Sequence, residues 1–409
     1  MRLLVRWAWT GAFFIAAAGS PSMGASKGDP LERLSSELYR CGADEGPAAL
    51  QRAIADHIGS RGLQRTMVTT PAGPALLLQI PGRVARPHVL LWGHTQLPAA
   101  AAAPQASPER LSGPGMGDMV ASLAIVAQVL RDRARVPQGE RGCTVSLLLC
   151  TDGGTEQALG AIEAQLGSAL SFQLVLVPEP TEELVLLGAR GRYVVDLTLQ
   201  GSPAPAARPH LGVNAIEDAA RVVTQLNKTR LRQHELLGRG VLTVGSILGG
   251  QGSGLGVPER CTLRLVRHVV PGEDRRIVVE DLQKAFEPLQ LRTSVRVEID
   301  EAAGPQYPAF LTERSPLVRL LLGTLREQEQ DPTQAEGAVS TSGEGRVVYG
   351  ESAGDYNVLG ARWPTAVYGP IGGEFGTPAE WVDVRSLRRV GWAISRVLTG
   401  IDSQLARAA

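Results

Sequence analysis

Three side chains that can bind a metal follow apolar or glycine-rich segments of this 409-residue chain. His94 directly follows the apolar run HVLLWG, Glu179 ends the segment LVLVPE, and Asp118 follows the glycine-rich turn GPGMG. Strand ends at the carboxyl edge of a sheet are where α/β folds build their sites. One histidine and two carboxylates at such an edge are suitable ligands for zinc. Each also has an ordinary role open to it, since Asp118 could cap a helix and Glu179 could be a solvated acid.

The elements that would position these residues are strands alternating with helices. Four apolar runs have the length of strands, and segments with helical spacing separate them. Near-continuous apolar strands between helices predict an α/β domain, with a central sheet covered by helices on both faces. The strands are ALLLQI, HVLLWG, TVSLLLCT and FQLVLVPEP, and the helices are DMVASLAIVAQVLRDR and EQALGAIEAQL.

The middle of the chain has a different pattern. Residues 191–302 read as strand, helix, strand, strand, helix, strand, which is the split βαβ unit of an α+β module. Apolar helical and strand patterns resume after it. We therefore expect an α/β domain whose first part is 27–190 and whose second part is 303–409, interrupted by this insert.

Composition and the N-terminus indicate the compartment and exclude some partners. Lys+Arg and Asp+Glu are both 41, so no net charge would draw the chain to nucleic acid. Residues 1–26 read as a secretory signal and leader, because Arg2 and Arg6 precede an apolar run of about a dozen residues and then small residues. An amphipathic helix or a start codon placed too early is the alternative. We expect an exported, periplasmic or secreted protein with no integral membrane segment in the mature chain.

The four cysteines are widely spaced along the sequence. Cys143 and Cys150 are seven residues apart on one expected strand, so their side chains would point to opposite faces. We therefore expect free, buried thiols rather than disulfides.

A series of short motifs resembles one enzyme family in its usual order, from about residue 31 to 398. It is similar to the zinc aminoacylase and carboxypeptidase family, which includes glutamate carboxypeptidase, acetylornithine deacetylase and succinyl-diaminopimelate desuccinylase. The insert resembles that family's lid and dimerisation domain, which implies a possible homodimer. The motifs are GHTQLP, GPGMGDM, TDGG, VPEPT, GVNAI, LVRHVVPGED, SAGDYNVLG, TAVYGP and GTPAEWVDV.

The resemblance implies one complete metal site and one incomplete one. His94, Asp118 and Glu179 match the ligands of one zinc ion. The second zinc of the family needs a further glutamate and a late histidine, and these positions are Gly154 and Gly376. Glycine has no side chain with which to bind a metal, so we expect at most one zinc.

The groups that do chemistry in the family are also replaced. The glutamate that acts as general base falls on Gly153, and the lid histidine falls near Pro205. By the same resemblance, the family's asparagine before a V-P pair falls on Leu255. The aspartate two residues after the first histidine becomes Gln96, which carries no charge.

Two positions that bind substrate in the family are retained. Arg267 matches the lid arginine that holds a substrate carboxylate, and Asp355 fits the pattern of the SAGDYN segment. Arg267 could equally be a surface arginine on a half-exposed strand. The implied ligand is a small amino-acid-like molecule or a peptide.

Three hypotheses remain open at this point. The first is a family member with little or no hydrolytic activity, which acts as a binding or scaffold protein. The second is a hydrolase of N-acyl amino acids or C-terminal peptide bonds with one metal, in which a shifted register makes Glu156 the base. The third is a purely structural fold in which the three ligands survive by chance.

Overall fold

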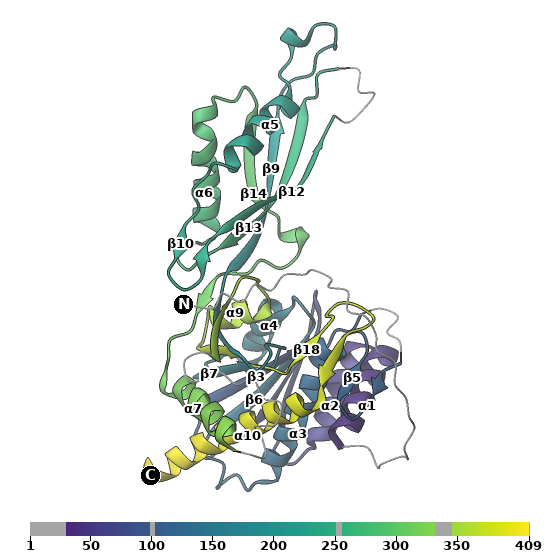
Figure 1. Cartoon of the computed structure of the whole chain (residues 1–409), viewed down its shortest axis with the longest axis vertical. Coiled ribbons are helices and arrows are strands. Elements are labelled where there is room, and N and C mark those ends of the chain that lie inside the picture. Colours follow the sequence, from purple (N-terminus) through teal and green to yellow (C-terminus); the bar gives the residue numbers. More distant parts are fainter. Residues whose placement is uncertain (1–29, 99–102, 251–255, 332–345, 409) are drawn as a thin grey trace. The chain divides into compact units, whose positions relative to one another are not determined.

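The computed structural model describes residues 30–98, 103–250, 256–331 and 346–408, and it divides into two compact units (Figure 1). The first contains the described residues up to Leu187, with Thr312–Val348 and Arg362–Ala409. The second contains Gly188–Leu311 and Tyr349–Ala361. The second unit therefore includes the predicted insert and, in addition, a short segment from late in the sequence.

The first unit is built on a mixed sheet. Its strands lie in the order β1-β2-β6-β3-β7-β17-β8, with β3, β6, β7 and β17 parallel to their neighbours in that group. Strand β6 is buried along its whole length, as expected for a strand covered on both faces. The strands are β1 (Gln64–Thr70), β2 (Gly73–Ile80), β3 (His88–His94), β6 (Thr144–Cys150), β7 (Leu174–Val177), β8 (Val185–Ala189) and β17 (Thr365–Val367).

Helices cover both faces of this sheet. The indole of Trp92 donates a hydrogen bond to Thr155 Oγ1 at 3.0 Å, at the start of α4, whereas a Cβ on Gly93 would lie 2.5 Å from Leu123 of α3. Consecutive residues of a strand point to opposite faces, so α3 and α4 lie on opposite sides. The helices are α1 (Pro30–Glu45), α2 (Pro47–Ile58), α3 (Ala121–Arg135), α4 (Thr155–Leu166), α7 (Pro316–Gln330) and α10 (Val384–Ala408).

A small second sheet lies beside the start of α3. Strand β19 (Trp381–Asp383) pairs with β18 (Gly372–Gly373) and with β5 (Arg110–Ser112), and β5 pairs with β4 (Gln105–Ala106). A π-helical turn, Met116–Val120, joins β5 to α3. Sequence patterns do not predict this sheet because its strands are only two or three residues long.

The second unit has the predicted order of elements. Its four-stranded sheet has the order β12-β13-β9-β14 and is antiparallel throughout, so β12 is an edge strand. Helices α5 and α6 pack on one face through an apolar core that includes Tyr193, Leu263 and Phe286. The elements are β9 (Gly191–Gln200), α5 (Ala215–Leu226), β10 (Gln233–His234), β11 (Gly238–Arg239), β12 (Val241–Gly249), β13 (Arg260–Val269), α6 (Arg275–Phe286), β14 (Ser294–Ile299), β15 (Phe310–Leu311), β16 (Val347–Gly350, which begins in the first unit) and α9 (Asp355–Gly360).

The predicted fold class is confirmed, with local differences. The first helical segment is divided into α1 and α2, because Gly46 adopts a left-handed φ of 84° and Pro47 begins α2. All four cysteines are free thiols, and three of them are buried as predicted, whereas Cys41 is partly exposed. The predicted secretory signal lies outside the described residues. In the part of the chain that is described, no helix has the length and apolarity needed to cross a membrane.

Candidate functional site

His94 is the last residue of β3 and is held by the neighbouring strand. It pairs with Cys150 of β6, and the backbone N–H of Thr95 donates to the Cys150 carbonyl at 2.8 Å. The His94 side chain is buried, with its Nε2 3.4 Å from Asp118 Oδ2. Its other ring nitrogen, Nδ1, is buried and has no hydrogen-bond partner among the described residues. The sequence therefore placed His94 correctly at a strand end, and the structure brings it beside Asp118.

The electrostatics of this pair favour a charged state. Burial alone would lower the pKa of His94, but the hydrogen bond and charge of Asp118, with the charges of Asp152 and Glu179, raise that pKa to about 9. Burial would likewise raise the pKa of the Asp118 carboxyl, and the contact with His94 lowers it below its ordinary value. A metal that binds here must therefore displace a proton from His94.

Asp118 lies in the π-helical turn that follows Gly113 and Gly115. Gly115 is left-handed, with φ 83°, and a Cβ on Gly117 would lie 2.7 Å from the Trp381 carbonyl oxygen. The turn is thus fitted closely against β19. The sequence predicted a helix start here, and the structure adds that Asp118 belongs to the turn before α3 rather than to its cap.

Glu179 lies in the turn that joins β7 to β8, and the neighbouring segments fix this turn. A Cβ on Gly369 would lie 2.0 Å from the Glu179 carbonyl oxygen, and the Gly369 N–H donates to Thr181 Oγ1 at 3.0 Å. Close approach of the two backbones therefore requires glycine at 369. The YGP segment that the sequence singled out shapes the Glu179 turn.

A buried carboxylate connects the same turn to helix α10. Glu183 has a left-handed φ of 61° and is fully buried. Its Oε1 accepts hydrogen bonds from Ser386 Oγ at 2.6 Å and from Arg389 Nε at 2.7 Å, both on α10. The turn that carries Glu179 is thereby tied to the last helix of the chain.

The turn after β6 has a shape that favours glycine. Gly153 has a φ of 71°, a conformation that L residues with a side chain rarely adopt. A Cβ on Gly154 would lie 2.7 Å from Thr151 Oγ1 and 3.1 Å from the Cβ of Ala72. The positions where the family resemblance expects two glutamates are therefore a tight turn, and Asp152 before them has an exposed side chain.

The loop that should carry the late histidine is also a glycine turn, and it leads to a buried acid. Gly376 is exposed and left-handed, with φ 73°. Its N–H donates to Oε2 of Glu380 at 3.2 Å. Glu380 is 1% exposed and also accepts from the backbone N–H groups of Gly115 and Asp118. Burial raises the pKa of Glu380, against these three donors, which lower it. Glu380 belongs to the motif GTPAEWVDV, but no pattern in the sequence indicates the backbone groups that it holds.

The weaker catalytic candidates lie at the surface. Gln96 and Glu156 are both exposed, Glu156 in the first turn of α4. Pro205 is exposed as well, and Leu255 lies outside the described residues.

In the second unit, Arg267 is buried in an ion pair with Glu273. Its guanidinium donates to Glu273 Oε1 and to the backbone carbonyl of His268, and it is 4% exposed. It is therefore not the half-exposed surface residue that the sequence left open as an alternative. Asp355 is buried too, and its Oδ1 accepts from the Tyr307 hydroxyl at 3.4 Å.

Two arginines and a histidine gather on the face of the second unit's sheet opposite to that covered by α5 and α6. His268 pairs in register with Arg192, and the charges of Arg192 and Arg190, after the larger effect of burial, lower the pKa of His268. Arg192 stacks over the Tyr307 ring at 5.0 Å. Sequence reasoning did not select this group, because Arg192 and His268 are 76 positions apart and only the strand register brings them together.

The donor set fits a metal only in part. Within the described ranges, no group of three or more His, Cys, Asp and Glu side chains is close enough to hold a metal as it stands. His94 and Asp118 are adjacent, and the unpartnered Nδ1 makes His94 the one buried imidazole that lacks a satisfied second nitrogen among those residues. An imidazole and a carboxylate are zinc ligands by chemistry, so His94 and Asp118 could hold an ion together with the nearby Glu179.

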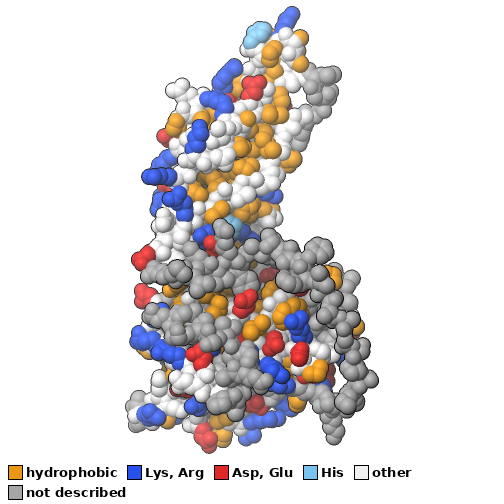
Figure 2. All heavy atoms as spheres, viewed as in Figure 1, with side chains coloured by type: hydrophobic (Ala, Val, Ile, Leu, Met, Phe, Trp, Pro, Cys, Tyr) orange, Lys and Arg blue, Asp and Glu red, His pale blue; other side chains and the backbone are white. Residues whose placement is uncertain are grey.

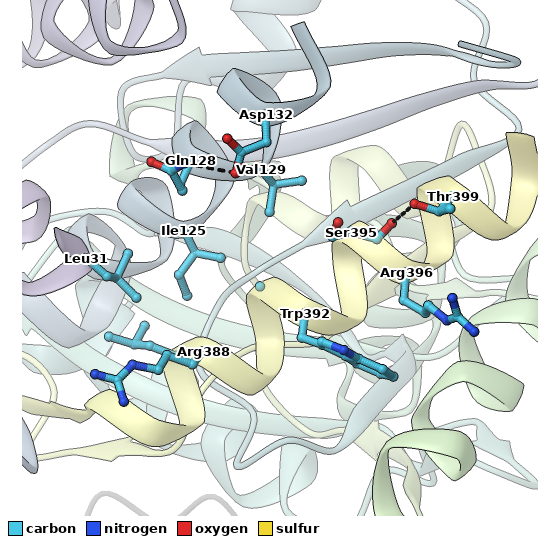
Figure 3. Close-up of a pocket in the computed structure, with 12 residues that line it drawn as sticks. Leu31, Ile125, Gln128, Val129, Asp132, Arg388, Trp392, Ser395, Arg396 and Thr399 are labelled. Atoms are coloured by element: carbon cyan, nitrogen blue, oxygen red, sulfur yellow. Dashed lines mark hydrogen bonds between the residues drawn. The ribbon is translucent and has the colours of Figure 1, made fainter. Parts of the chain in front are cut away.

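A groove on the first unit lies away from these residues and does not include them. It has a volume of about 490 Å³ and lies between α1, α3 and α10 (Figure 3). Its walls carry apolar side chains with a polar rim and have no histidine. The residues are Leu31, Ile125, Gln128, Val129, Asp132, Leu387, Arg388, Gly391, Trp392, Ser395, Arg396 and Thr399.

Comparison with known proteins supports the resemblance seen in the sequence. Residues 187–294 match the M20 peptidase dimerisation domain. DapE of Mycobacterium tuberculosis, provisionally named succinyl-diaminopimelate desuccinylase, is 25% identical over 228 residues, which is 54% of this chain and 62% of that protein. The match therefore spans less than two thirds of that relative.

Solved structures of low identity have the same fold. A tripeptidase from Staphylococcus aureus superposes with a TM-score of 0.70 at 16% identity, covering 91% of this chain and 98% of that one. An M20 family metallo-carboxypeptidase from Sulfolobus solfataricus gives 0.66 at 15% identity, covering 91% and 99%. The chain therefore has the fold of these solved structures, and its residues 187–294 match the dimerisation domain of M20 peptidases.

Proposed function

We propose that this protein binds one zinc ion through His94, Asp118 and Glu179, and that it binds an amino-acid-like or peptide ligand with little or no hydrolysis. The observation that carries the proposal is the turn after β6. Gly153 is left-handed and Gly154 has no room for a Cβ, so the turn that would hold a base and a second-metal ligand is built for glycine.

Zinc in such a site supplies Lewis-acid chemistry. The contribution of this chain is limited to holding the ion and orienting a ligand. Asp118 and His94 set the ligand geometry, and the turns around Glu179 and Asp118 keep it rigid. A base beside the site is the missing part, since proton transfer needs an acceptor within hydrogen-bond reach.

The test is the zinc content of protein purified without chelator and then supplied with zinc, together with assays on N-succinyl and N-acetyl amino acids and on tripeptides. One ion per chain, with hydrolysis at the background rate, is the expected result. Two tightly held ions, or strong hydrolysis that His94→Ala removes, would overturn it.

A hydrolase with one metal remains the second candidate, and Asp152 is the observation that favours it. Asp152 lies two residues beyond Cys150, the strand partner of His94, and its charge acts on His94. Asp152 and Glu156 are both exposed, but the charge of Asp152 acts on His94, so Asp152 is the better candidate for the base. If hydrolysis is found, Asp152→Asn should reduce it more than Glu156→Gln does.

We place the recognition of a ligand carboxylate on the second unit, on the face that carries Arg192 and His268. Arg267, the residue that the family resemblance selects, could reach a ligand only by giving up Glu273, and a buried charge left without its partner is costly. Asp355 accepts a hydrogen bond from Tyr307, and the guanidinium of Arg192 lies over the Tyr307 ring. Arg192→Ala should weaken ligand binding more than Arg267→Lys does, measured by calorimetry with N-succinyl amino acids.

We also propose a homodimer through the edge strand β12. Its side chains include Val241, Ile247 and Leu248, which are 41%, 51% and 66% exposed. Apolar side chains run along this unit in Figure 2. An exposed apolar edge strand is a template for pairing with another strand. Ile247→Lys with Leu248→Lys should give a monomer by light scattering, whereas Met67→Lys, on the exposed β1 of the first unit, should leave the dimer intact.

Export is proposed from the first 26 residues alone. N-terminal sequencing of the protein recovered from cell fractions tests it, with cleavage near Ala18 expected and an intact Met1 as the contrary result.

A further inference from the structure

The buried carboxylate of Glu380 holds three separate backbone N–H groups. Oε1 accepts from Asp118 at 2.6 Å, and Oε2 accepts from Gly115 at 2.9 Å and from Gly376 at 3.2 Å. All three donors are backbone groups of glycine-rich turns. Hydrogen bonds to a charged acceptor are stronger than those between neutral groups. The single carboxylate of Glu380 therefore links the backbone at Gly115, Asp118 and Gly376.

The backbone of the same residue fixes the other end of the turn. The Gly113 N–H donates to the Glu380 carbonyl at 2.8 Å, and the next residue, Trp381, pairs with Ser112. Glu380 thus contacts the segment before and after the left-handed Gly115. Because the turn is short and glycine-rich, its conformation in isolation is poorly determined. The conformation of the turn is fixed by its contacts with Glu380 and with the strand that follows it, β19.

These contacts determine the position of Asp118, which lies within the π-helical turn Met116–Val120. Asp118 receives its backbone constraint from Glu380 Oε1, and its carboxylate lies 3.4 Å from His94. No other side chain in the described part of the structure accepts the Asp118 N–H. Removing the acceptor would free the turn to rotate and move the Asp118 carboxylate away from His94.

We propose that Glu380 is a positioning residue, which fixes the turn that presents Asp118 to His94 and thereby to a metal. The part of this proposal that concerns metal rests on the proposed function. Glutamine at 380 has the same shape but only one acceptor oxygen, so its amide group would face either Asp118 N–H or the two glycine N–H groups, donor against donor.

The experiment compares Glu380→Gln with Asp218→Asn in the full chain. Asp218 is a matched control because it is also buried and its Oδ2 accepts the backbone N–H groups of Arg292 and Thr293, both at 2.9 Å, but in the second unit. Zinc affinity is measured by competition with a chelator, and melting temperature is measured without metal.

Glu380→Gln should weaken zinc binding about 10- to 100-fold, the usual effect of losing a residue that orients a ligand. Asp218→Asn should lower the melting temperature but leave zinc affinity within about twofold. Equal zinc affinity of Glu380→Gln and wild type would overturn the proposal, whatever the change in stability.

Hydrogen exchange in the metal-free protein separates this proposal from the proposed function. If the wild type binds no zinc, the proposed function fails on its own. The positioning role is then decided by the amides of Asp118, Gly115 and Gly376, because whichever of them face the glutamine amide group should exchange at least tenfold faster in Glu380→Gln than in wild type. Unchanged protection of all three amides would overturn the proposal.

Discussion

The turns that carry ligands and the turns that lack them are held in different ways. The Glu179 turn is tied to α10 by the buried carboxylate of Glu183, and the Asp118 turn is tied to β19 by that of Glu380. The turns at Gly153 and Gly376 keep their shape through left-handed glycine backbone. Buried carboxylates therefore hold the turns of Glu179 and Asp118, whereas both glycine turns depend on left-handed backbone, and the Gly376 turn also donates to the Glu380 carboxylate. The difference supports our proposal of a single metal position.

The largest effect should come from removing the anchor of the Glu179 turn. Glu183→Ala leaves Arg389 buried without its carboxylate, which should cost about 3–5 kcal/mol of unfolding free energy. Urea denaturation measures it. Ser386→Ala removes only a neutral donor to the same carboxylate and should cost about 1 kcal/mol. A loss of less than about 1 kcal/mol in Glu183→Ala would mean that the turn keeps its shape without this carboxylate.

Restoring side chains to the glycine turn tests the other half of the comparison. Gly153→Glu with Gly154→Glu should destabilise the protein, by about 1–2 kcal/mol for the left-handed position and about 1–3 kcal/mol for the crowded one. We expect no gain of hydrolysis. Gly160→Glu is the matched control, because a Cβ there meets nothing within 4 Å in helix α4, and it should raise stability by up to about 1 kcal/mol. A stable double variant that hydrolyses peptides would show that the turn adapts readily.

Loss of the buried imidazole should remove the remaining metal position. His94→Ala should weaken zinc binding by more than about 100-fold, since the loss of a direct ligand exceeds that of an orienting residue. Equilibrium dialysis measures it. His57→Ala is the control, because His57 contacts Gln128 and Arg131 on α3 instead of the candidate ligands. Retention of zinc by His94→Ala would place the ion elsewhere.

The smallest effect concerns the histidine at the opposite end of β3. Burial lowers the pKa of His88 to about 4, below its unfolded value of 6.5. Protonation therefore favours the unfolded state, and stability that is present above about pH 6.5 is lost as pH falls towards 4. Because the ring is partly exposed, we expect about 1–2 kcal/mol of this loss to come from His88.

The measurement is the unfolding free energy of wild type and His88→Gln at pH 7 and pH 4.5. The variant keeps a hydrogen-bonding group near Ser146 and should lose less stability between the two values. An identical pH dependence in the two proteins would contradict the prediction.

Much of the fold could be predicted because its long elements have strong patterns. The buried runs at β3 and β6 and the β-α-β-β-α-β order of the insert have the predicted types and near-predicted bounds. The small sheet of β5 and β19 could not be predicted, because two- and three-residue strands carry no periodicity. The same holds for Glu380, which lies 262 positions from the N–H group that it holds.

The sequence by itself determined which residues could act. It placed His94 at a strand end, put glycine where a base and a second ligand are expected, and supplied the module that matches a dimerisation domain. Tertiary structure alone decided which of these side chains meet. Arg267 forms a buried ion pair with Glu273, and Asp118 lies beside His94. Contacts of this kind depend on strand register and on the shape of turns, and neither is encoded within a short stretch of sequence.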